Sequence, residues 1–498
     1  MALIQITDLT FTYPGSFDPV FEHVSFQLDT DWRLGLTGRN GRGKTTLLRL
    51  LQGQYPHQGT ITAPGGFEYF PYPIPDAALT PLELLECSFP DVPQWRLRRE
   101  LAPLFVTDDA LYRPFSTLSG GEQAKILLAL LFAREGRYLL IDEPTNHLDE
   151  TGRALVSRYL AKKSGFLLVS HDRAFLDGCV DHILSINRGG IEVQKGNFSS
   201  WYENRQRQDA FELAQNAQLK KEIGRLKQAA RQSRAWADKV ESTKIGPHSA
   251  KVTGEADAMG GRAYIGEQSR RMQQRRKNLE RRQNAAIEEK SALLKNIEQP
   301  APLKLRQLPY HTSRLALLRD VSVCYGGAPV CSGVSFSIEQ GDRIALRGAN
   351  GTGKTSLLRL ICGEDVPHTG TVEIGSRLQI SHVQQDPSGL RGDLSAYAAQ
   401  HGLDESLFKA ILRKLDFARV QFEKDMADFS AGQKKKVLLA RSLCEPSHLL
   451  VWDEPLNYVD VLSRIQLEEL LLEFKPAILF VEHDRMFCEH VATKTVVL

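Results

Sequence analysis

The chain has 498 residues, which is too long for a single hydrophobic core, so two domains and a connecting segment are expected. Its 42% hydrophobic and 25% charged residues are typical of a soluble globular protein, and no apolar run reaches the roughly 18 residues that span a membrane. The seven cysteines are scattered singly, which argues against a disulfide framework or a zinc site. Without a signal-peptide pattern at the N-terminus, this composition predicts a cytoplasmic protein with no membrane domain.

The net charge of +3 is unevenly distributed along the chain. Residues 204–298 contain 21 Lys and Arg against 12 Asp and Glu, a net charge of +9 that leaves −6 for the remainder. A basic middle between two mildly acidic parts predicts a polyanionic partner for the middle.

A glycine-rich motif stands between a strand-like and a helix-like segment early in the chain. It has the pattern G-x-x-x-x-G-K-T, after Leu34–Thr37 and before Leu47–Leu51. Such glycines let backbone N–H groups surround phosphate oxygens at a helix N-terminus, while the lysine reaches the β- and γ-phosphates and the threonine binds Mg²⁺. The nucleotide-binding candidates are Gly38, Asn40, Gly41, Gly43, Lys44, Thr45 and Thr46.

Two further apolar strands of this part end in polar residues. One ends in Asp142 and Glu143, and the next leads to His171. Because ligands of a parallel α/β sheet bind at the carboxyl ends of its strands, these side chains should face the phosphate loop. We expect Asp142 to bind Mg²⁺, Glu143 to polarise an attacking water and His171 to contact the γ-phosphate.

A Ser-Gly-Gly sequence, Ser119 to Gly121 with Gly120 between them, opens a helical segment before the carboxylate strand. Exposed N–H groups at a helix start favour an anion. Taken alone, such a sequence is an ordinary turn with an N-cap. Its recurrence at Ser430 and Gly432 favours the functional interpretation.

The same order of motifs recurs about 310 residues later, which indicates a tandem duplication. The second set consists of the phosphate-loop residues Gly348, Asn350, Gly351, Gly353, Lys354, Thr355 and Ser356, the metal ligands Thr355 and Asp453, and the catalytic residues Glu454 and His483. Strands that alternate with helices predict an α/β fold with mainly parallel sheets. We expect a first lobe over residues 1–202 and a second lobe over residues 306–498.

The linker between the lobes, residues 203–305, is rich in helix-forming and charged residues. Apolar residues spaced by 4 and 3, such as Leu219, Ile223 and Leu226, predict an amphipathic helix over 205–241, and 270–298 is equally helix-prone. With a Gly-rich tip near 242–269, these segments predict an antiparallel hairpin whose arms are about 45–55 Å long. A solvated spacer is the plain alternative, and the basic excess favours an arm that makes contacts.

This set of motifs, in this order, resembles the ATP-binding cassette superfamily over both lobes. Leu118–Gln123 is similar to the family signature, and Asp149 and Asp460 stand at its D-loop positions. The resemblance implies that Tyr13 and Tyr325 stack on adenine.

The family resemblance also implies that the lobes pair head to tail within a monomer. Each ATP, bound with Mg²⁺, then lies between the phosphate loop of one lobe and the signature of the other. The first site would include Ser430 and Gly432 of the second lobe, whereas the second site would include Ser119 and Gly121 of the first. Gln385, at the Q-loop position, would join the metal ligands of the second site.

Two cassettes joined by a charged helical hairpin resemble the ABC-F class, whose members act on ribosomes. Trp32–Lys44 and Trp452–Val461 are similar to the antibiotic-resistance ribosomal protection subgroup, of the type that protects against lincosamides, streptogramin A and pleuromutilins. The resemblance implies an ATP hydrolase whose linker contacts ribosomal RNA and the P-site tRNA.

The chain departs from the family pattern at two positions. Tyr72 stands where the first Q-loop glutamine is expected, and Ala431 replaces a signature glycine. A housekeeping ABC-F translation factor stays open as an alternative function. The soluble ATPase of a membrane transporter has no use for a basic hairpin, and a DNA-repair cassette carries its coiled coil inside one cassette.

Overall fold

The computed structural model describes residues 2–15, 19–146, 148–187, 190–244, 307–325, 328–349, 351–415, 417 and 419–498. The chain divides into two units, Met1–Trp201 with Ala301–Leu498, and Tyr202–Pro300. The first unit holds both lobes. The helical arm predicted over 270–298, the tip from residue 245 onward and Asn350 lie outside the described residues.

The first lobe begins with a three-stranded antiparallel sheet in the order β2-β1-β4. Its strands are β1 (Leu3–Phe11), β2 (Phe21–Asp29) and β4 (Gln58–Thr62). Ile4, Ile6, Leu9 and Phe11 of β1 are buried, and the alternation shifts by one residue between Ile6 and Leu9, where the pairing with β2 is irregular. The expectation of mainly parallel strands did not include this separate sheet, in which β1 and β2 are joined by a short connection that only antiparallel strands permit.

The central sheet of the first lobe has the order β5-β6-β7-β3-β8-β9. The strands are β3 (Arg33–Gly38), β5 (Phe67–Phe70), β6 (Tyr138–Asp142), β7 (Phe166–Val169), β8 (His182–Asn187) and β9 (Gly190–Lys195). All neighbours pair in parallel except β8 and β9. The continuous apolar runs of β6 and β7 are buried, as a parallel sheet covered on both faces requires.

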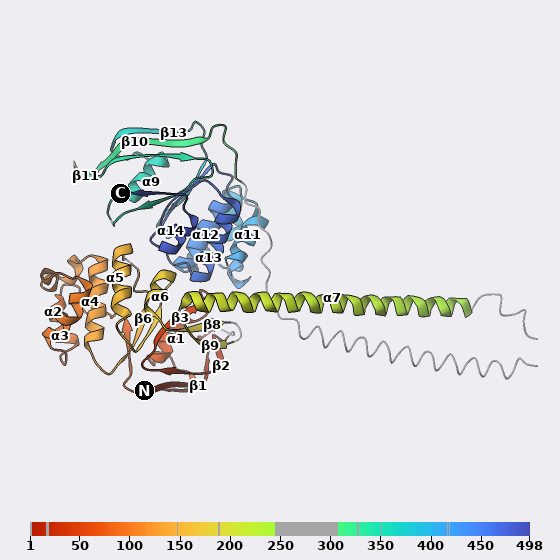
Figure 1. Cartoon of the computed structure of the whole chain (residues 1–498), viewed down its shortest axis with the longest axis horizontal. Helices are drawn as coiled ribbons and strands as arrows, with labels where there is room; N and C mark the ends of the chain where they lie inside the picture. Colours follow the sequence, from red (N-terminus) through yellow and green to blue (C-terminus); the bar gives the residue numbers. More distant parts are fainter. Residues whose placement is uncertain are drawn as a thin grey trace, which may run out of the picture. The chain divides into compact units, whose positions relative to one another are not determined.

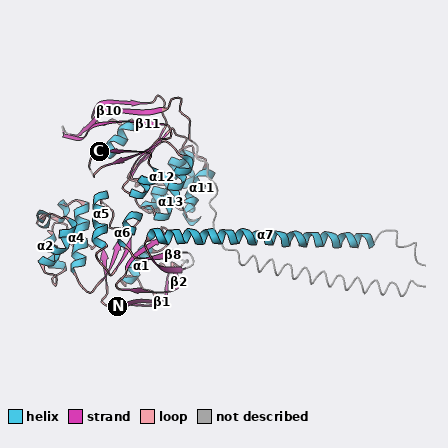
Figure 2. Ribbon diagram, viewed as in Figure 1, coloured by secondary structure: helices cyan, strands magenta, loops and turns pink. Residues whose placement is uncertain are grey.

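The helices of the first lobe lie around these sheets, and Figure 2 shows a helix-rich and a strand-rich part in each lobe. They are α1 (Lys44–Leu51), α2 (Pro81–Ser88), α3 (Gln94–Leu101), α4 (Gly120–Ala133), α5 (Glu150–Leu160) and α6 (Arg173–Cys179), with 3-10 turns at Ala102–Leu104, Asp108–Leu111 and Phe115–Thr117. The predicted helix after Ser119 is α4, which begins with a capping box between Ser119 and Glu122.

The second lobe repeats this plan, as the tandem duplication predicts. An antiparallel sheet has the order β11-β10-β13, and a parallel sheet has the order β14-β15-β16-β12-β17. The strands are β10 (Arg314–Tyr325), β11 (Ala328–Glu339), β12 (Arg343–Arg347), β13 (His368–Ile374), β14 (Ile380–Val383), β15 (Leu449–Asp453), β16 (Ile478–Val481) and β17 (Lys494–Val497). The helices are α9 (Lys354–Ile361), α10 (Leu394–Gln400), α11 (Glu405–Lys414), α12 (Ala431–Cys444), α13 (Val461–Phe474) and α14 (Arg485–Val491), with 3-10 turns at Arg419–Glu423 and Met426–Asp428.

Helix α7 (Phe198–Lys244) is one continuous helix in Figure 1. It begins earlier than the predicted 205–241, because Phe198 and Trp201 are buried with ring centroids 5.4 Å apart and Ser199 N donates to Asp177 Oδ1 at 2.8 Å. In the part of the chain that is described, no helix combines the length and apolarity needed to cross a membrane.

The core of the second lobe contains one polar bond that can be tested. Trp452 of β15 is fully buried, and its Nε1 donates to Ser442 Oγ at 2.8 Å. We expect Trp452→Phe to lower the free energy of unfolding by about 1–3 kcal/mol, since it removes the donor and leaves a small cavity. Urea denaturation followed by circular dichroism measures this. Ser442→Ala removes the same bond, so the double variant should lose less than the sum of the single variants, and strict additivity would contradict the bond's contribution.

Candidate nucleotide-binding sites

The parallel strands bring the predicted residues of the first lobe to one edge of the sheet. The phosphate loop follows β3, Asp142 ends β6, and His171 follows β7, which lies between them. Thr45 Oγ1 donates to Asp142 Oδ2 at 3.3 Å, and His171 Nε2 lies 3.2 Å from Glu143 Oε1. This edge is the first site.

In each phosphate loop, the lysine of the motif folds back and donates hydrogen bonds to oxygen atoms of the same loop. Lys44 Nζ donates to Gly38 O at 2.7 Å and to Asn40 Oδ1 at 3.2 Å, whereas Lys354 Nζ donates to Gly348 O at 2.9 Å and to Ala349 O at 2.7 Å. Both ammonium groups are buried and are held by carbonyl groups that a phosphate can replace. The loops therefore have the donor set that a nucleotide phosphate needs.

The glycine before each lysine is required by the backbone. Gly43 has φ +89° and Gly353 has φ +83°, a left-handed conformation that residues with a side chain rarely adopt. A Cβ on Gly43 would lie 2.6 Å from Val20 Cγ1. The same left-handed conformation occurs at Gly41 and Gly351.

Burial dominates the electrostatics of the first site. Burial, with a smaller effect of the neighbouring Asp142, raises the pKa of Glu143 to about 8. Burial also raises the pKa of Asp142 and, together with the charge of Lys44, holds the pKa of His171 well below its usual value. In this closed loop, burial therefore favours the protonated form of Glu143, whereas its counterpart in the second site has a lowered pKa.

The second site is built around Glu454, which has three hydrogen-bonding neighbours. Gln385 Nε2 donates to Glu454 Oε2 at 2.7 Å, Asn457 Nδ2 donates to the same oxygen at 2.6 Å, and His483 Nε2 lies 3.5 Å from Oε1. Burial alone would raise the pKa of Glu454, but the bonds from His483 and Gln385 lower it to about 2. Glu454 is therefore ionised at neutral pH, as a residue that polarises water must be.

Both glutamates adopt an uncommon backbone conformation. Glu143 has φ +50° and Glu454 has φ +45°. Residues with a side chain are rare in this left-handed region, and such strain concentrates at functional sites. Its occurrence at the same position of both lobes supports a role for these two side chains.

The two predicted adenine-stacking tyrosines have matching environments. Tyr13 OH lies 2.7 Å from Thr46 Oγ1, and Tyr325 OH lies 3.2 Å from Ser356 Oγ. Both rings are exposed, at 39% and 45%. Each hydroxyl is thus tied to the helix that follows the phosphate loop, and the Tyr13 ring also contacts Phe11 and Tyr55 in edge-to-face arrangements.

Strand register shows how the Q-loop position differs between the lobes. Phe70 pairs with Ile141, and Val383 pairs with Trp452, so Tyr72 corresponds to Gln385. The Tyr72 ring packs on Phe89 at a centroid distance of 4.9 Å. The first site instead receives Tyr69, whose hydroxyl donates to Asp142 Oδ2 at 2.9 Å.

The signature segments also differ. Gly432 of the second lobe lies at the first phosphate loop, since a Cβ on it would be 3.1 Å from Asn40 Nδ2, which donates to Tyr458 O at 2.9 Å. Ser430 caps α12 just before it. Within the described residues, by contrast, no hydrogen bond or ion pair joins Ser119, Gly120 or Gly121 to the second lobe.

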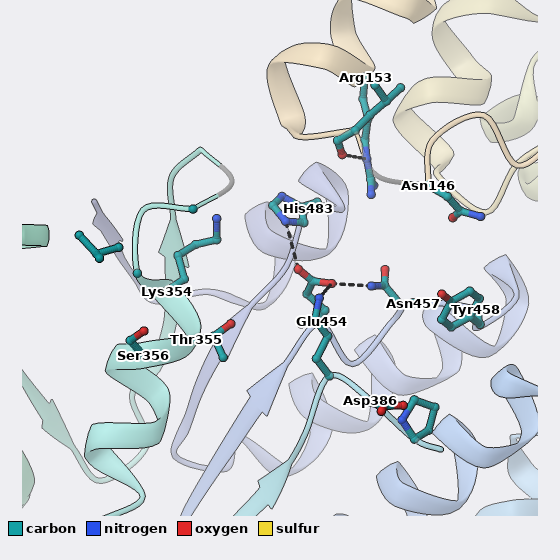
Figure 3. A pocket seen from close by; sticks show the side chains of 16 residues that line it. Asn146, Arg153, Lys354, Thr355, Ser356, Asp386, Glu454, Asn457, Tyr458 and His483 are labelled. Atoms are coloured by element: carbon teal, nitrogen blue, oxygen red, sulfur yellow. Dashed lines mark hydrogen bonds and ion pairs between the residues drawn. The ribbon is translucent and has the colours of Figure 1, made fainter. Parts of the chain in front are cut away.

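A cavity of ≈ 620 Å³ marks the second site. Figure 3 shows Lys354, Thr355, Glu454 and His483 around it, together with Arg153 from the first lobe. Asn146 and Leu148 of the first lobe also line it. Both lobes therefore contribute residues to the lining of the second site.

The carboxylate at the second site fits a divalent cation. Asp453 is buried, and its Oδ1 has no hydrogen-bond partner among the described residues. Thr355 hydrogen-bonds the same carboxylate and lowers its pKa, which burial raises. A threonine hydroxyl beside an unpaired carboxylate oxygen is the donor set that Mg²⁺ takes in phosphate-loop proteins.

The family model described as ABC transporter matches residues 21–68 and 331–457. The ribosome protection protein VmlR of Bacillus subtilis is 27% identical over 99% of this chain and 87% of its own length. The energy-dependent translational throttle protein EttA of Escherichia coli is 26% identical over 95% of this chain and 88% of its own. Over nearly its whole length, the chain is similar to ATP-binding cassette proteins of the ABC-F type.

Solved structures agree with the two-cassette fold of this chain. The archaeal ribosome recycling factor aABCE1, in complex with ribosomal stalk protein aP1, has a TM-score of 0.62 at 18% identity and covers 98% of this chain and 87% of that one. The structure of RNase-L Inhibitor has a TM-score of 0.57 at 20% identity, and the likeness covers 93% of this chain and 82% of that one. At such identities the likeness establishes the fold alone.

Three residues of the two sites were missed by sequence reasoning. Asn146 follows Glu143 by three residues, as Asn457 follows Glu454, and this repetition was a usable signal. Lys435 gave no such signal, because its counterpart after the first signature is Ala124. Its Nζ, fully buried, donates to Gln384 O at 2.8 Å, Gln385 O at 3.2 Å and Asp453 O at 3.2 Å.

Lys435 therefore fixes the Q-loop to the end of β15. We expect Lys435→Met to leave these carbonyl groups without a donor and to accelerate amide hydrogen exchange at residues 384–386 by on the order of tenfold. Hydrogen exchange read by mass spectrometry measures this. Lys434→Met, one residue earlier on the same helix, is the matched control. Equal exchange rates at residues 384–386 in both variants would contradict a role of Lys435 in fixing the Q-loop.

Proposed function

We propose that this chain is a ribosome-associated ATPase that hydrolyses ATP to ADP and phosphate and changes shape as it does so. The observation that carries the proposal is the second site, where an ionised Glu454 is held by Gln385, Asn457 and His483 beside a phosphate loop. We assign the first lobe to residues 1–202, the linker to 203–305 and the second lobe to 306–498.

The residues of the second site divide the work of hydrolysis. Lys354 and the loop N–H groups bind the phosphates, and Thr355 with Asp453 would hold Mg²⁺, which neutralises charge on the phosphate oxygens when bound. Glu454 accepts a hydrogen bond from the attacking water, while His483 donates toward the γ-phosphate. The residues of the first site, including Lys44, Glu143 and His171, form the equivalent set.

The basic linker supports a polyanionic partner, and ribosomal RNA with the P-site tRNA has the matching charge. Two relatives point the same way, one titled a ribosome protection protein and the other a translational throttle. We propose ATP-dependent protection of a cytoplasmic ribosome by a monomer of this chain, against antibiotics that act at the peptidyl-transferase centre. A housekeeping translation factor is the second candidate, favoured by the EttA likeness.

The two glutamates provide the first test. Glu143→Gln with Glu454→Gln leaves the phosphate-binding lysines in place but removes the group that orients water, so hydrolysis should slow by on the order of 10²–10⁴-fold. The variant should then accumulate on ribosomes in ATP, measured by sucrose-gradient sedimentation. Lys44→Ala with Lys354→Ala, which weakens phosphate binding, should stay off ribosomes. A glutamine variant that binds ATP but sediments alone would contradict the mechanism.

Drug susceptibility separates protection from housekeeping. Replacing residues 254–266 with a Gly-Ser turn leaves both lobes and the basic arms, so ATPase activity and ribosome sedimentation should be kept. Protection of a sensitive host against lincosamides, streptogramin A and pleuromutilins should be lost, as measured by inhibitory concentrations. No protection by the unmodified chain would favour the housekeeping function, and equal protection by both chains would exclude the tip as the acting part.

A further inference from the structure

Arg153 of the first lobe lies in the cavity of the second lobe's nucleotide site. It belongs to α5, yet it lines the same cavity as Lys354, Glu454 and His483. Its guanidinium points into that space in Figure 3. No sequence motif marked this residue, because the lobe that carries it and the site that it lines lie far apart in the chain.

The Arg153 guanidinium is hydrogen-bonded to the protein through two of its three nitrogens. Its Nε donates to Leu148 O at 3.1 Å, and its Nη1 pairs with Asp172 Oδ2 at 3.0 Å. Asp172 is itself fixed, since it caps α6 by accepting from Phe175 N at 3.0 Å. Nη2 has no protein partner among the described residues, so N–H donors remain for an anion in the cavity.

The equivalent arginine of the second lobe is different. Arg464 uses all three nitrogens within its own lobe, on Val459 O at 2.9 Å, Asp484 Oδ2 at 3.1 Å and Leu456 O at 2.9 Å. The loop that offers Leu456 O is fixed by Glu482, which accepts from Leu456 N at 2.6 Å. This contrast makes Arg153, rather than Arg464, the arginine with spare donors.

In the first lobe the corresponding loop lacks that carboxylate. Ser170 stands in the place of Glu482, and its hydroxyl lies 3.4 Å from Thr145 Oγ1. Among the described residues, Arg153 bonds one carbonyl group where Arg464 bonds two, and its remaining donors face the second site.

We propose that Arg153 binds the terminal phosphate of ATP held in the second lobe's site, acting across the boundary between the lobes; this rests on the proposed ATPase function. A guanidinium donates two parallel hydrogen bonds to a phosphate, which an ammonium cannot match in geometry. Because Leu148 O and Asp172 already orient it, little side-chain entropy is lost on binding. The contact exists only with a γ-phosphate, so it distinguishes ATP from ADP.

The test measures nucleotide affinity at the second site alone. In a Lys44→Ala background, binding of a fluorescent, non-hydrolysable ATP analogue reports the second site. Adding Arg153→Gln should weaken that binding about ten- to a hundredfold, the value of one charged hydrogen-bonding group, and leave the affinity for fluorescent ADP unchanged. Arg153→Lys keeps the positive charge but not the pair of parallel donors. It should therefore lower the affinity for the ATP analogue less than Arg153→Gln does.

Two controls separate a phosphate contact from a structural role. In a Lys354→Ala background, which reports the first site, Arg153→Gln should leave ATP affinity unchanged. Arg158→Gln, on the exposed face of the same helix, should change neither affinity. Equal losses for ATP and ADP, or no loss for ATP, would overturn the proposal. Failure of the unmodified chain to bind ATP or to sediment with ribosomes would instead count against the proposed function.

Discussion

The parallel pairing of β6, β7 and β3, with its counterpart of β15, β16 and β12, is the constraint on which the rest of the structure depends. Asp142 pairs with Val169 and Asp453 with Val481, so the strands of each pair end at the same level. The glutamate that follows is then fixed by one further bond, from Glu143 N to Val169 O at 2.9 Å in the first lobe and from Glu454 N to Val481 O at 3.1 Å in the second. In each lobe this bond fixes the backbone of the glutamate, which has a left-handed conformation, beside the histidine and the phosphate loop.

The same scaffold carries two sites with different surroundings. In the first site, Tyr69 contacts Asp142 and the second lobe closes on Asn40. In the second site, Gln385 and Lys435 fix the Q-loop and a cavity stays open beside Glu454. The two sites thus share a backbone arrangement but differ in a few side chains. The strand ends fix the position of each site residue, whereas neighbouring side chains decide what that residue contacts.

Much of the fold follows from local patterns. Each phosphate-loop motif and each apolar strand with terminal carboxylates has a signal within about ten residues, so the two lobes, their parallel sheets and helix α4 could be predicted. The antiparallel sheet of β1, β2 and β4 was not distinguished from the parallel one. Strand-like alternation is the same in both, and only the partner decides the direction.

The sequence alone determined the candidate residues for binding phosphate and polarising water, because that chemistry needs fixed residue types at fixed spacing, repeated in both lobes. Contacts between distant segments were decided only by the tertiary structure. Tyr72 packs on Phe89, Lys435 bonds three carbonyl groups, and Arg153 reaches the other lobe's cavity. None of these follows from spacing, since each depends on how side chains from separate strands and helices meet in space.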